Sequence, residues 1–168
     1  YGEPSELARV AGTEDPWLYA SGCVGLTNCL VPLVGEGDGR AEYIVRLGFS
    51  APDTDRPGQR VFDIKLQGKV VEQDFDVVKA AGGPDRAVIK EFRGIPVDKD
   101  LKLELVPKLQ KPDKTRAPLI NTIEVARERV LSVGMLVPSL LLSDADAETM
   151  GEIVLANRGE KEFVGSLQ

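Results

Sequence analysis

Apolar residues alternate with polar ones along short segments of this chain, and glycine, proline or aspartate separates the segments. In residues 41–49 the alternating positions are Tyr43, Val45, Leu47 and Phe49. In residues 60–66 they are Phe62, Ile64 and Leu66. A period of two places apolar side chains on one face of an extended strand, whereas a helix would repeat them every three to four residues. The alternation therefore predicts β-strands that each bury one face.

Turn-forming residues predict how these segments connect. Gln67-Gly68 follows the second segment, and residues 69–74 return as its hairpin partner. Residues 76–81 are too few for a stable isolated helix, so we expect one turn that leads into the loop at residues 82–84 (GGP).

Three further strands are expected after that loop. The first has Val88, Lys90 and Phe92 on one face. Residues 95–97 and 101–105 then flank a polar turn, a pattern typical of a hairpin. Six or more short strands without a helical period favour two packed antiparallel sheets, which is an all-β sandwich.

The last third of the chain continues this pattern less regularly. Residues 108–118 (KLQKPDKTRAP) predict a surface loop, and residues 119–125 predict a single strand. Residues 130–142 predict one or two buried strands, residues 144–148 an acidic loop, and residues 151–167 a hairpin.

The charge and hydropathy of the chain narrow the class of partner. It carries 21 basic and 27 acidic residues, a net charge of −6 at pH 7, and so offers no broad positive field to a phosphate backbone. The longest apolar run, residues 131–142, is interrupted by serine, glycine and proline and is shorter than the ~18 residues that span a bilayer. We expect no nucleic-acid partner and no membrane insertion.

The residue types present also restrict the chemistry. The sequence has no histidine, which excludes Ser-His-Asp and Cys-His catalytic groups and imidazole metal sites. Two carboxylates alone can hydrolyse a glycoside, but no pattern marks a pair of them here. Asp144, Asp146 and Glu148 have the spacing of calcium ligands without the glycine and distal glutamate of an EF-hand loop, so a solvated loop is favoured. We expect no enzyme, no cofactor and no metal.

The two cysteines, Cys23 and Cys29, are six positions apart. That separation is too long for a disulfide along one extended strand, but a bridge across a loop is possible. Two free, buried thiols that pack as small apolar residues are the alternative.

Three stretches resemble the core of malectin-like domains, in the same order and at close to the same spacing. They are residues 43–49 (YIVRLGF), 58–71 (GQRVFDIKLQGKVV) and 74–83 (DFDVVKAAGG). Residues 103–106 and 118–125 resemble the two closing strands of the family. The resemblance covers roughly residues 1–126 and implies a jelly-roll-like sandwich used in carbohydrate recognition. Residues 127–168 are then expected to be extra strands that complete the sandwich or lead into a neighbouring domain.

The resemblance also implies where a sugar would bind. Sugar sites of this kind stack an aromatic face on C–H groups and hydrogen-bond hydroxyls with carboxylates and amides at a loop rim. Tyr1-Gly2 and Leu18-Tyr19 resemble paired landmarks of the family, so Tyr1 matches one aromatic ligand, and Asp113 matches an acidic ligand. Family members normally begin with a strand before this landmark, so we expect the fold to be truncated in front.

Other candidate ligands come from the residues themselves. Trp17 and Tyr19 could form a stacking platform, with a core or strand-edge position as the alternative. Asp53, Asp55 and Arg56 could hydrogen-bond a polar ligand, with a solvated turn as the alternative. We expect Asp74 and Asp76 to be structural and to bond the backbone near the loop at residues 82–83.

These observations predict a non-catalytic carbohydrate-binding module of a larger extracytoplasmic bacterial protein, either secreted, periplasmic or at the cell surface. The alternative is a structural or protein-interaction module that has lost sugar binding and contacts a neighbouring domain or chain through a sheet edge near Tyr1 or residues 119–125. An open cleft near Tyr19 and residues 51–57 would favour the sugar, and a filled surface would favour the interaction.

Overall fold

The computed structural model describes residues 10–35, 39–128, 131–136 and 152–157, in two compact units, residues 1–128 and 129–168. The first unit contains, in chain order, η1 (Pro16–Tyr19), β1 (Cys23–Val24), β2 (Asn28–Pro32), β3 (Ala41–Ser50), β4 (Val61–Leu66), β5 (Lys69–Asp76), α1 (Val77–Ala81), β6 (Ala87–Val97), β7 (Asp100–Pro107), β8 (Leu119–Ile120) and β9 (Thr122–Arg127). The second unit contains β10 (Leu131–Leu136) and β11 (Glu152–Asn157), which pair with each other.

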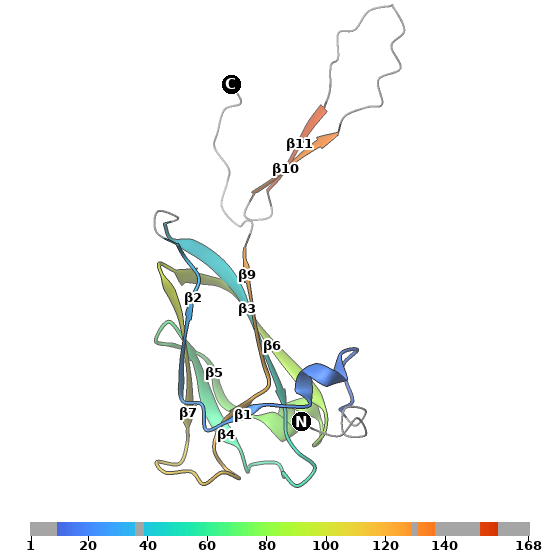
Figure 1. Ribbon diagram of the computed structural model, residues 1–168, viewed down its shortest axis with the longest axis vertical. Coiled ribbons are helices and arrows are strands. Elements are labelled where there is room, and N and C mark those ends of the chain that lie inside the picture. The colour runs from blue at the N-terminus through green and yellow to red at the C-terminus, as the bar shows by residue number, and fades with distance from the viewer. Residues whose placement is uncertain (1–9, 36–38, 129–130, 137–151, 158–168) are drawn as a thin grey trace, which may run out of the picture. The chain divides into compact units, whose positions relative to one another are not determined.

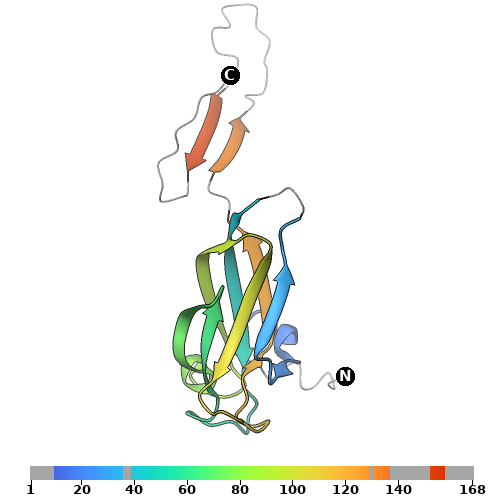
Figure 2. The ribbon, with the colours of Figure 1, turned by 90° about the vertical axis from the view of Figure 1, so that its left-hand side faces the viewer.

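The first unit is an antiparallel β-sandwich, as the alternation predicts (Figure 1). One layer is the four-stranded sheet β2-β7-β4-β5, which Figure 2 shows face-on, with β2 in light blue at one edge and β5 in green at the other. The other layer is the three-stranded sheet β6-β3-β9, and the short pair β1-β8 forms a separate ladder.

The core consists of the alternating residues that face between the two sheets. Val45, Leu47 and Phe49 of β3 are fully buried, and so are Phe62 and Ile64 of β4. The rings of Phe49, Phe62 and Phe75 pack with centroids 4.8 to 6.0 Å apart. Burial of one face of each strand is what fixes the register, because a shift of one residue would expose the whole apolar set.

The hairpin expected at residues 69–74 is confirmed as β4-β5. The hairpin expected from residues 95–97 and 101–105 is wrong, since β6 and β7 lie in different sheets. β6 pairs with β3 in one sheet, whereas β7 pairs with β2 and β4 in the other sheet. Because both edges of β7 are taken, β6 and β7 cannot pair, and the turn between them crosses from one layer to the other.

The single strand expected over residues 119–125 is also wrong. Asn121 divides it into β8, which pairs with β1, and β9, which pairs with β3. The Asn121 side chain bonds three backbone groups outside either ladder, and this interrupts the strand.

The expectations for Asp76, for the two cysteines and for the last third of the chain have separate outcomes. Asp76 caps α1 as a structural residue, since its carboxylate accepts hydrogen bonds from the backbone N–H groups of Lys79 and Gly58. Both cysteines are free, with Cys23 exposed and Cys29 partly buried, so the structure shows neither the bridge nor two buried thiols. The acidic loop at residues 144–148 and the second half of the hairpin at residues 151–167 lie outside the described residues.

In the described part of the chain, no helix has the length and hydropathy to cross a bilayer.

Candidate functional site

Asn121 ties together three segments at the end of β3. Its Oδ1 accepts a hydrogen bond from the backbone N–H of Ser50 at 2.7 Å. Its Nδ2 donates to the carbonyl oxygens of Tyr19 at 3.3 Å and Ser21 at 2.9 Å. The amide therefore uses both its donor and its acceptor capacity to hold the segment after η1 against the sheet.

Tyr19 lies on the outer face of β3, directly over Gly48. A Cβ atom at position 48 would lie 2.8 Å from the Tyr19 Oη, so only glycine lets the ring approach this closely. Burial raises the pKa of Tyr19 above its ordinary value, the charge of Asp15 adds to this, and a hydrogen bond with Thr122 opposes it. The ring anchors η1, and its edge contributes to a pocket.

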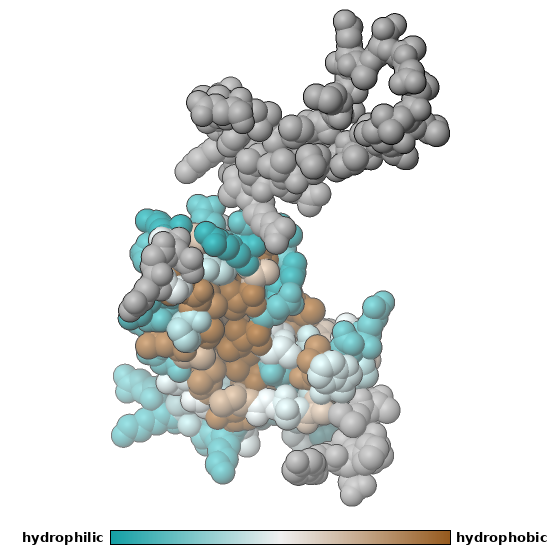
Figure 3. Space-filling model, turned by 45° about the horizontal axis from the view of Figure 1, so that its top comes forward, coloured by the Kyte–Doolittle hydropathy of each residue, from teal (hydrophilic) through white to brown (hydrophobic). Residues whose placement is uncertain are grey.

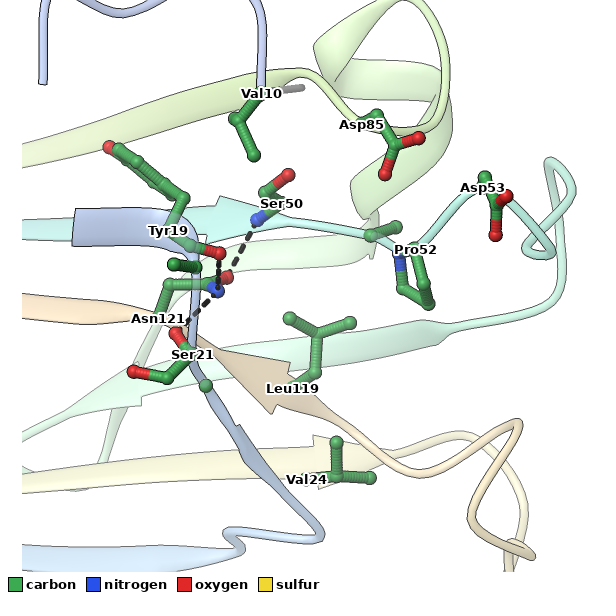
Figure 4. A pocket seen from close by; sticks show the side chains of 13 residues that line it. Val10, Tyr19, Ser21, Val24, Ser50, Pro52, Asp53, Asp85, Leu119 and Asn121 are labelled. Carbon is green, nitrogen blue, oxygen red and sulfur yellow. Dashed lines mark hydrogen bonds between the residues drawn. The ribbon is translucent and has the colours of Figure 1, made fainter. Parts of the chain in front are cut away.

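That pocket has a volume of about 320 Å³ and is lined by side chains of mixed character. Its polar lining comes from Ser21, Ser50, Asp53, Asp85 and Asn121, and its apolar lining from Val10, Tyr19, Val24, Pro52 and Leu119. In the view of Figure 4, Asp53 and Asp85 lie toward the right of the pocket, and Tyr19, Ser21 and Asn121 lie at its left. Within the described residues, neither Asp carboxylate has a hydrogen-bond or ion-pair partner. The pocket is an open cleft that offers hydroxyl and carboxylate groups together.

Backbone bonds fix the position of Asp85. Its N–H donates to the Ala51 carbonyl at 2.8 Å, and its own carbonyl accepts from the Ala11 N–H at 2.9 Å. Its φ of +48° is left-handed, a conformation that aspartate tolerates better than most residues. The carboxylate is therefore attached to a backbone that is held on both sides.

The structure brings together only some of the residues that the sequence suggests as ligands. Tyr19 and Asp53 line the pocket. Trp17 is 60% exposed on η1 and outside the pocket lining, with its Nε1 3.3 Å from the Asp15 carboxylate. Tyr1 lies outside the described residues.

The remaining three candidates hold loops in place. Asp55 is buried and forms an ion pair with Arg60, so it is not part of a solvated turn. Arg56 donates to the carbonyl oxygens of Asp53 and Asp55. The Asp113 carboxylate accepts from Thr115 and from the Arg116 N–H, and the first of these bonds contributes most to lowering its pKa below the ordinary value.

Sequence reasoning missed Asn121 and Asp85 as pocket residues. The signal for Asn121 is an amide inside an otherwise apolar strand pattern, and the signal for Asp85 is a polar residue directly after Gly-Gly-Pro. Neither signal shows that the two side chains line one pocket, because the other residues of that pocket lie far away in the sequence. Among residues 10–35 and 39–128, no cluster of Cys, Asp and Glu is arranged to hold a metal ion.

Comparison with known proteins agrees with this architecture. The family model described as the malectin domain matches residues 8–121. A probable receptor-like protein kinase of Arabidopsis thaliana is 35% identical over 78 residues, which cover 42% of this chain and 10% of the kinase. The similarity therefore spans about a tenth of that curated relative.

Two solved structures share the fold. A β-glucuronidase 2 of Bacteroides uniformis superposes with a TM-score of 0.59 at 16% identity, over 72% of this chain and 12% of the enzyme. The plant protein FER, in a complex with the peptide RALF23 and LLG2, superposes with a TM-score of 0.54 at 22% identity, over 70% of this chain and 35% of that chain.

Proposed function

Because this chain belongs to the malectin domain family, we propose that it is a non-catalytic carbohydrate-binding module of a larger extracytoplasmic protein. The sugar binds in the pocket beside Tyr19 and Asn121. Domains of this family are typically binding modules, and the family assignment rests on more than half of the chain. A bacterial parent protein stays a prediction, since the curated relative comes from Arabidopsis thaliana.

The observation that carries this proposal is the composition of the pocket. Two carboxylates that have no partner among the described residues and two serine hydroxyls line one cleft, whose wall the Asn121 amide holds in place. Such groups hydrogen-bond sugar hydroxyls, and a cleft with a few convergent polar groups is typical of small-ligand sites. A general acid for glycoside hydrolysis is usually kept protonated by burial, and Asp53 is exposed, which favours binding over cleavage.

The expected ligands then take different roles. Asp53 and Asp85 accept hydrogen bonds from sugar hydroxyls, and the exposed ring of Trp17 stacks on a sugar unit beside the pocket. Tyr19, Asp55, Arg56 and Asp113 position the rim, and Tyr1 remains a predicted aromatic ligand.

Calorimetric titration with a panel of neutral and acidic glucans, galactans and mannans tests this proposal. We expect saturable binding that Asp85→Asn and Asp53→Asn each weaken about tenfold, because hydrogen bonds to charged groups are the stronger ones. Asp98→Asn is the matched control, since Asp98 is an exposed carboxylate that pairs with Arg40 at the other end of β3. No binding to any member of the panel would refute the proposal.

A strand-adding protein partner is the second candidate function, and a different observation favours it. β9 forms one edge of its sheet and β2 forms one edge of the other sheet. Their inward apolar residues, Val31, Ile123 and Val125, are only partly buried. Figure 3 shows a continuous hydrophobic surface on the face where Figure 1 places β2 and β9 toward the viewer. An unpaired edge beside apolar surface is suited to recognising an extended strand.

Hydrogen exchange tests this second candidate. In the chain at a dilution where sedimentation shows a monomer, the Ile123 and Val125 amides should exchange fast, while those of Val45 and Leu47 on central β3 should exchange slowly. Slow exchange at Ile123 and Val125 in the monomer would mean that the chain covers its own edge, and the second candidate would fail.

A further inference from the structure

A second pocket lies at the same end of the sandwich, between the loop from β3 to β4 and the loop from β7 to β8. It has a volume of about 690 Å³ and is lined by residues 57–59 of the first loop and by Lys108, Thr115 and Arg116 of the second, among others. The first loop also provides Ala51, Pro52 and Asp53 to the pocket beside Tyr19. One loop therefore contributes to both pockets.

The two loops carry positive charge in an acidic protein. Residues 51–60 and 108–118 contain six cations and three carboxylates, although the whole chain has a net charge of −6. Two of the cations are neutralised: Arg60 pairs with the buried Asp55, and Lys108 lies 2.7 Å from the carboxylates of Asp63 and Asp74. The other four, Arg56, Lys111, Lys114 and Arg116, form no ion pair within the described residues.

Arg116 is the one of these four that lines the second pocket. The Asp113 carboxylate accepts hydrogen bonds from the backbone N–H of Arg116 at 3.1 Å and from that of Thr115 at 2.9 Å. The Asp113 side chain therefore holds the turn that carries the Arg116 guanidinium. Gln59 joins the two loops, donating to the Thr115 carbonyl at 3.0 Å. The guanidinium is thus attached to a fixed backbone, and its planar fork suits a carboxylate or a sulfate.

We propose that this second pocket is a subsite for the anionic group of a polysaccharide, with Arg116 as its main ligand and Lys111 and Lys114 contributing to the local positive field. The proposal rests on the proposed carbohydrate function and extends it to polymers that bear carboxylate or sulfate groups. A polymer fits better than a monosaccharide, because both pockets share the loop of residues 51–60. A polysaccharide is favoured over an acidic peptide because the loop that lines this pocket also lines the proposed sugar pocket, so the units of one polymer can reach both.

The test compares dextran, alginate and dextran sulfate as neutral, carboxylate and sulfate probes of the whole chain, by calorimetry at low and at moderate salt. We expect the chain to bind at least one of the two anionic polymers more tightly than dextran, despite its negative net charge, and to lose affinity as salt is added. Arg116→Gln should weaken this binding about tenfold, since a charge-assisted bidentate contact is lost. Arg116→Lys should be intermediate, because it keeps the charge without the fork.

Lys99→Gln is the matched control, because Lys99 is an exposed cation in the turn between β6 and β7, away from both loops. It should leave the affinity unchanged, and urea unfolding checks that all variants are folded. Binding of dextran alone, or an equal loss in Arg116→Gln and Lys99→Gln, would overturn the subsite and leave the carbohydrate proposal standing. Equal affinity for poly-glutamate would overturn the choice of a polysaccharide. No binding of any glycan would overturn both proposals.

Discussion

The two lateral openings of the sandwich are closed in different ways. Between β5 and β6 the chain itself crosses from one sheet to the other through α1, whose Val77 and Val78 are buried. Lys90 of β6 reaches Glu72 of β5 at 2.8 Å, and its Nζ lies 5.2 Å from the centre of the Phe75 ring. We call this side the closed seam.

The opposite side, between β2 and β9, is the open seam. At its loop end, the β1-β8 pair connects the two layers and buries Leu119 and Ile120. Beyond this pair, no described element covers Val31, Ile123 and Val125, which stay partly buried.

The two seams therefore differ in how fully their apolar side chains are buried. At the closed seam Val77 and Val78 are buried, and the Lys90 ammonium lies over the Phe75 ring and bonds Glu72. These contacts make the closed seam part of the folding core. Apolar surface left at an unpaired edge contributes less to folding and remains available to a partner.

Removing the closed seam's main aromatic side chain should have the largest effect. Phe75→Ala leaves a cavity among Phe49, Phe62 and the Lys90 stem, and we expect the free energy of unfolding in urea to fall by roughly 3–5 kcal/mol. Leu30→Ala is the control, because Leu30 is 62% exposed on β2 beside the open seam and should cost little. Similar losses in the two variants would contradict the distinction between the seams.

Asn121 supports the β1-β8 pair, which covers the loop end of the open seam. Asn121→Ala leaves the Ser50 N–H and the Tyr19 and Ser21 carbonyls without this partner, and we expect a loss of roughly 2 kcal/mol in the free energy of unfolding. It should also speed hydrogen exchange in β1 and β8 and weaken any sugar bound beside Tyr19. Asn28→Ala, at an exposed position of β2, should change none of these. Unchanged exchange in β1 and β8 would mean that their pairing alone closes this end.

One substitution made on two paired residues compares a central strand with the open seam directly. Val45 and Val125 are cross-strand partners, but Val45 is fully buried and Val125 is only partly buried. A buried hydroxyl without a partner is costly, so we expect Val45→Thr to destabilise the fold by roughly 1 kcal/mol more than Val125→Thr. Equal costs in urea unfolding would indicate that the open seam is covered in solution.

Sequence pattern predicted the strands well because alternation is a local property. It identified β3, β4, β5 and the core that they share. It misassigned the turn between β6 and β7, since a hairpin and a crossing between layers have the same local sequence. What decides between them is β2, which takes one edge of β7 and shows no clear alternation of its own.

The pocket was less predictable for the same reason. Asn121 acts through bonds to residues 71 to 102 positions away, and such distances carry no local signal. Tyr19 was suggested as an aromatic ligand, and its ring both lines the pocket and packs over Gly48, a contact that no local pattern predicts. Asp55 was suggested as a ligand, and its burial with Arg60 gives it a supporting role.

The smallest expected effect concerns a polar cluster on β4 and β5, the strands on the closed-seam side of their sheet. Asp63 accepts from the Asp74 N–H at 2.8 Å, and Lys108 lies 2.7 Å from its Oδ1. The bond from Lys108, then the bond from Asp74, hold the pKa of Asp63 below its ordinary value. A carboxylate with a lowered pKa stabilises the folded state above its unfolded pKa, and this contribution is lost as the pH falls through the folded pKa.

We therefore expect Asp63→Asn to lower the free energy of unfolding by about 0.5 kcal/mol at neutral pH, a value typical of partly exposed ion pairs. The difference from the wild type should shrink as the pH falls below about 4 and vanish once the wild-type carboxyl is protonated in both states. Urea unfolding of both proteins across this range measures it, and Asp98→Asn on the exposed turn after β6 is the control. A difference that persists at the lowest pH would show that Asp63 contributes by packing rather than by charge. The ionisation of this cluster would then make no contribution to the free energy of unfolding on the closed-seam side.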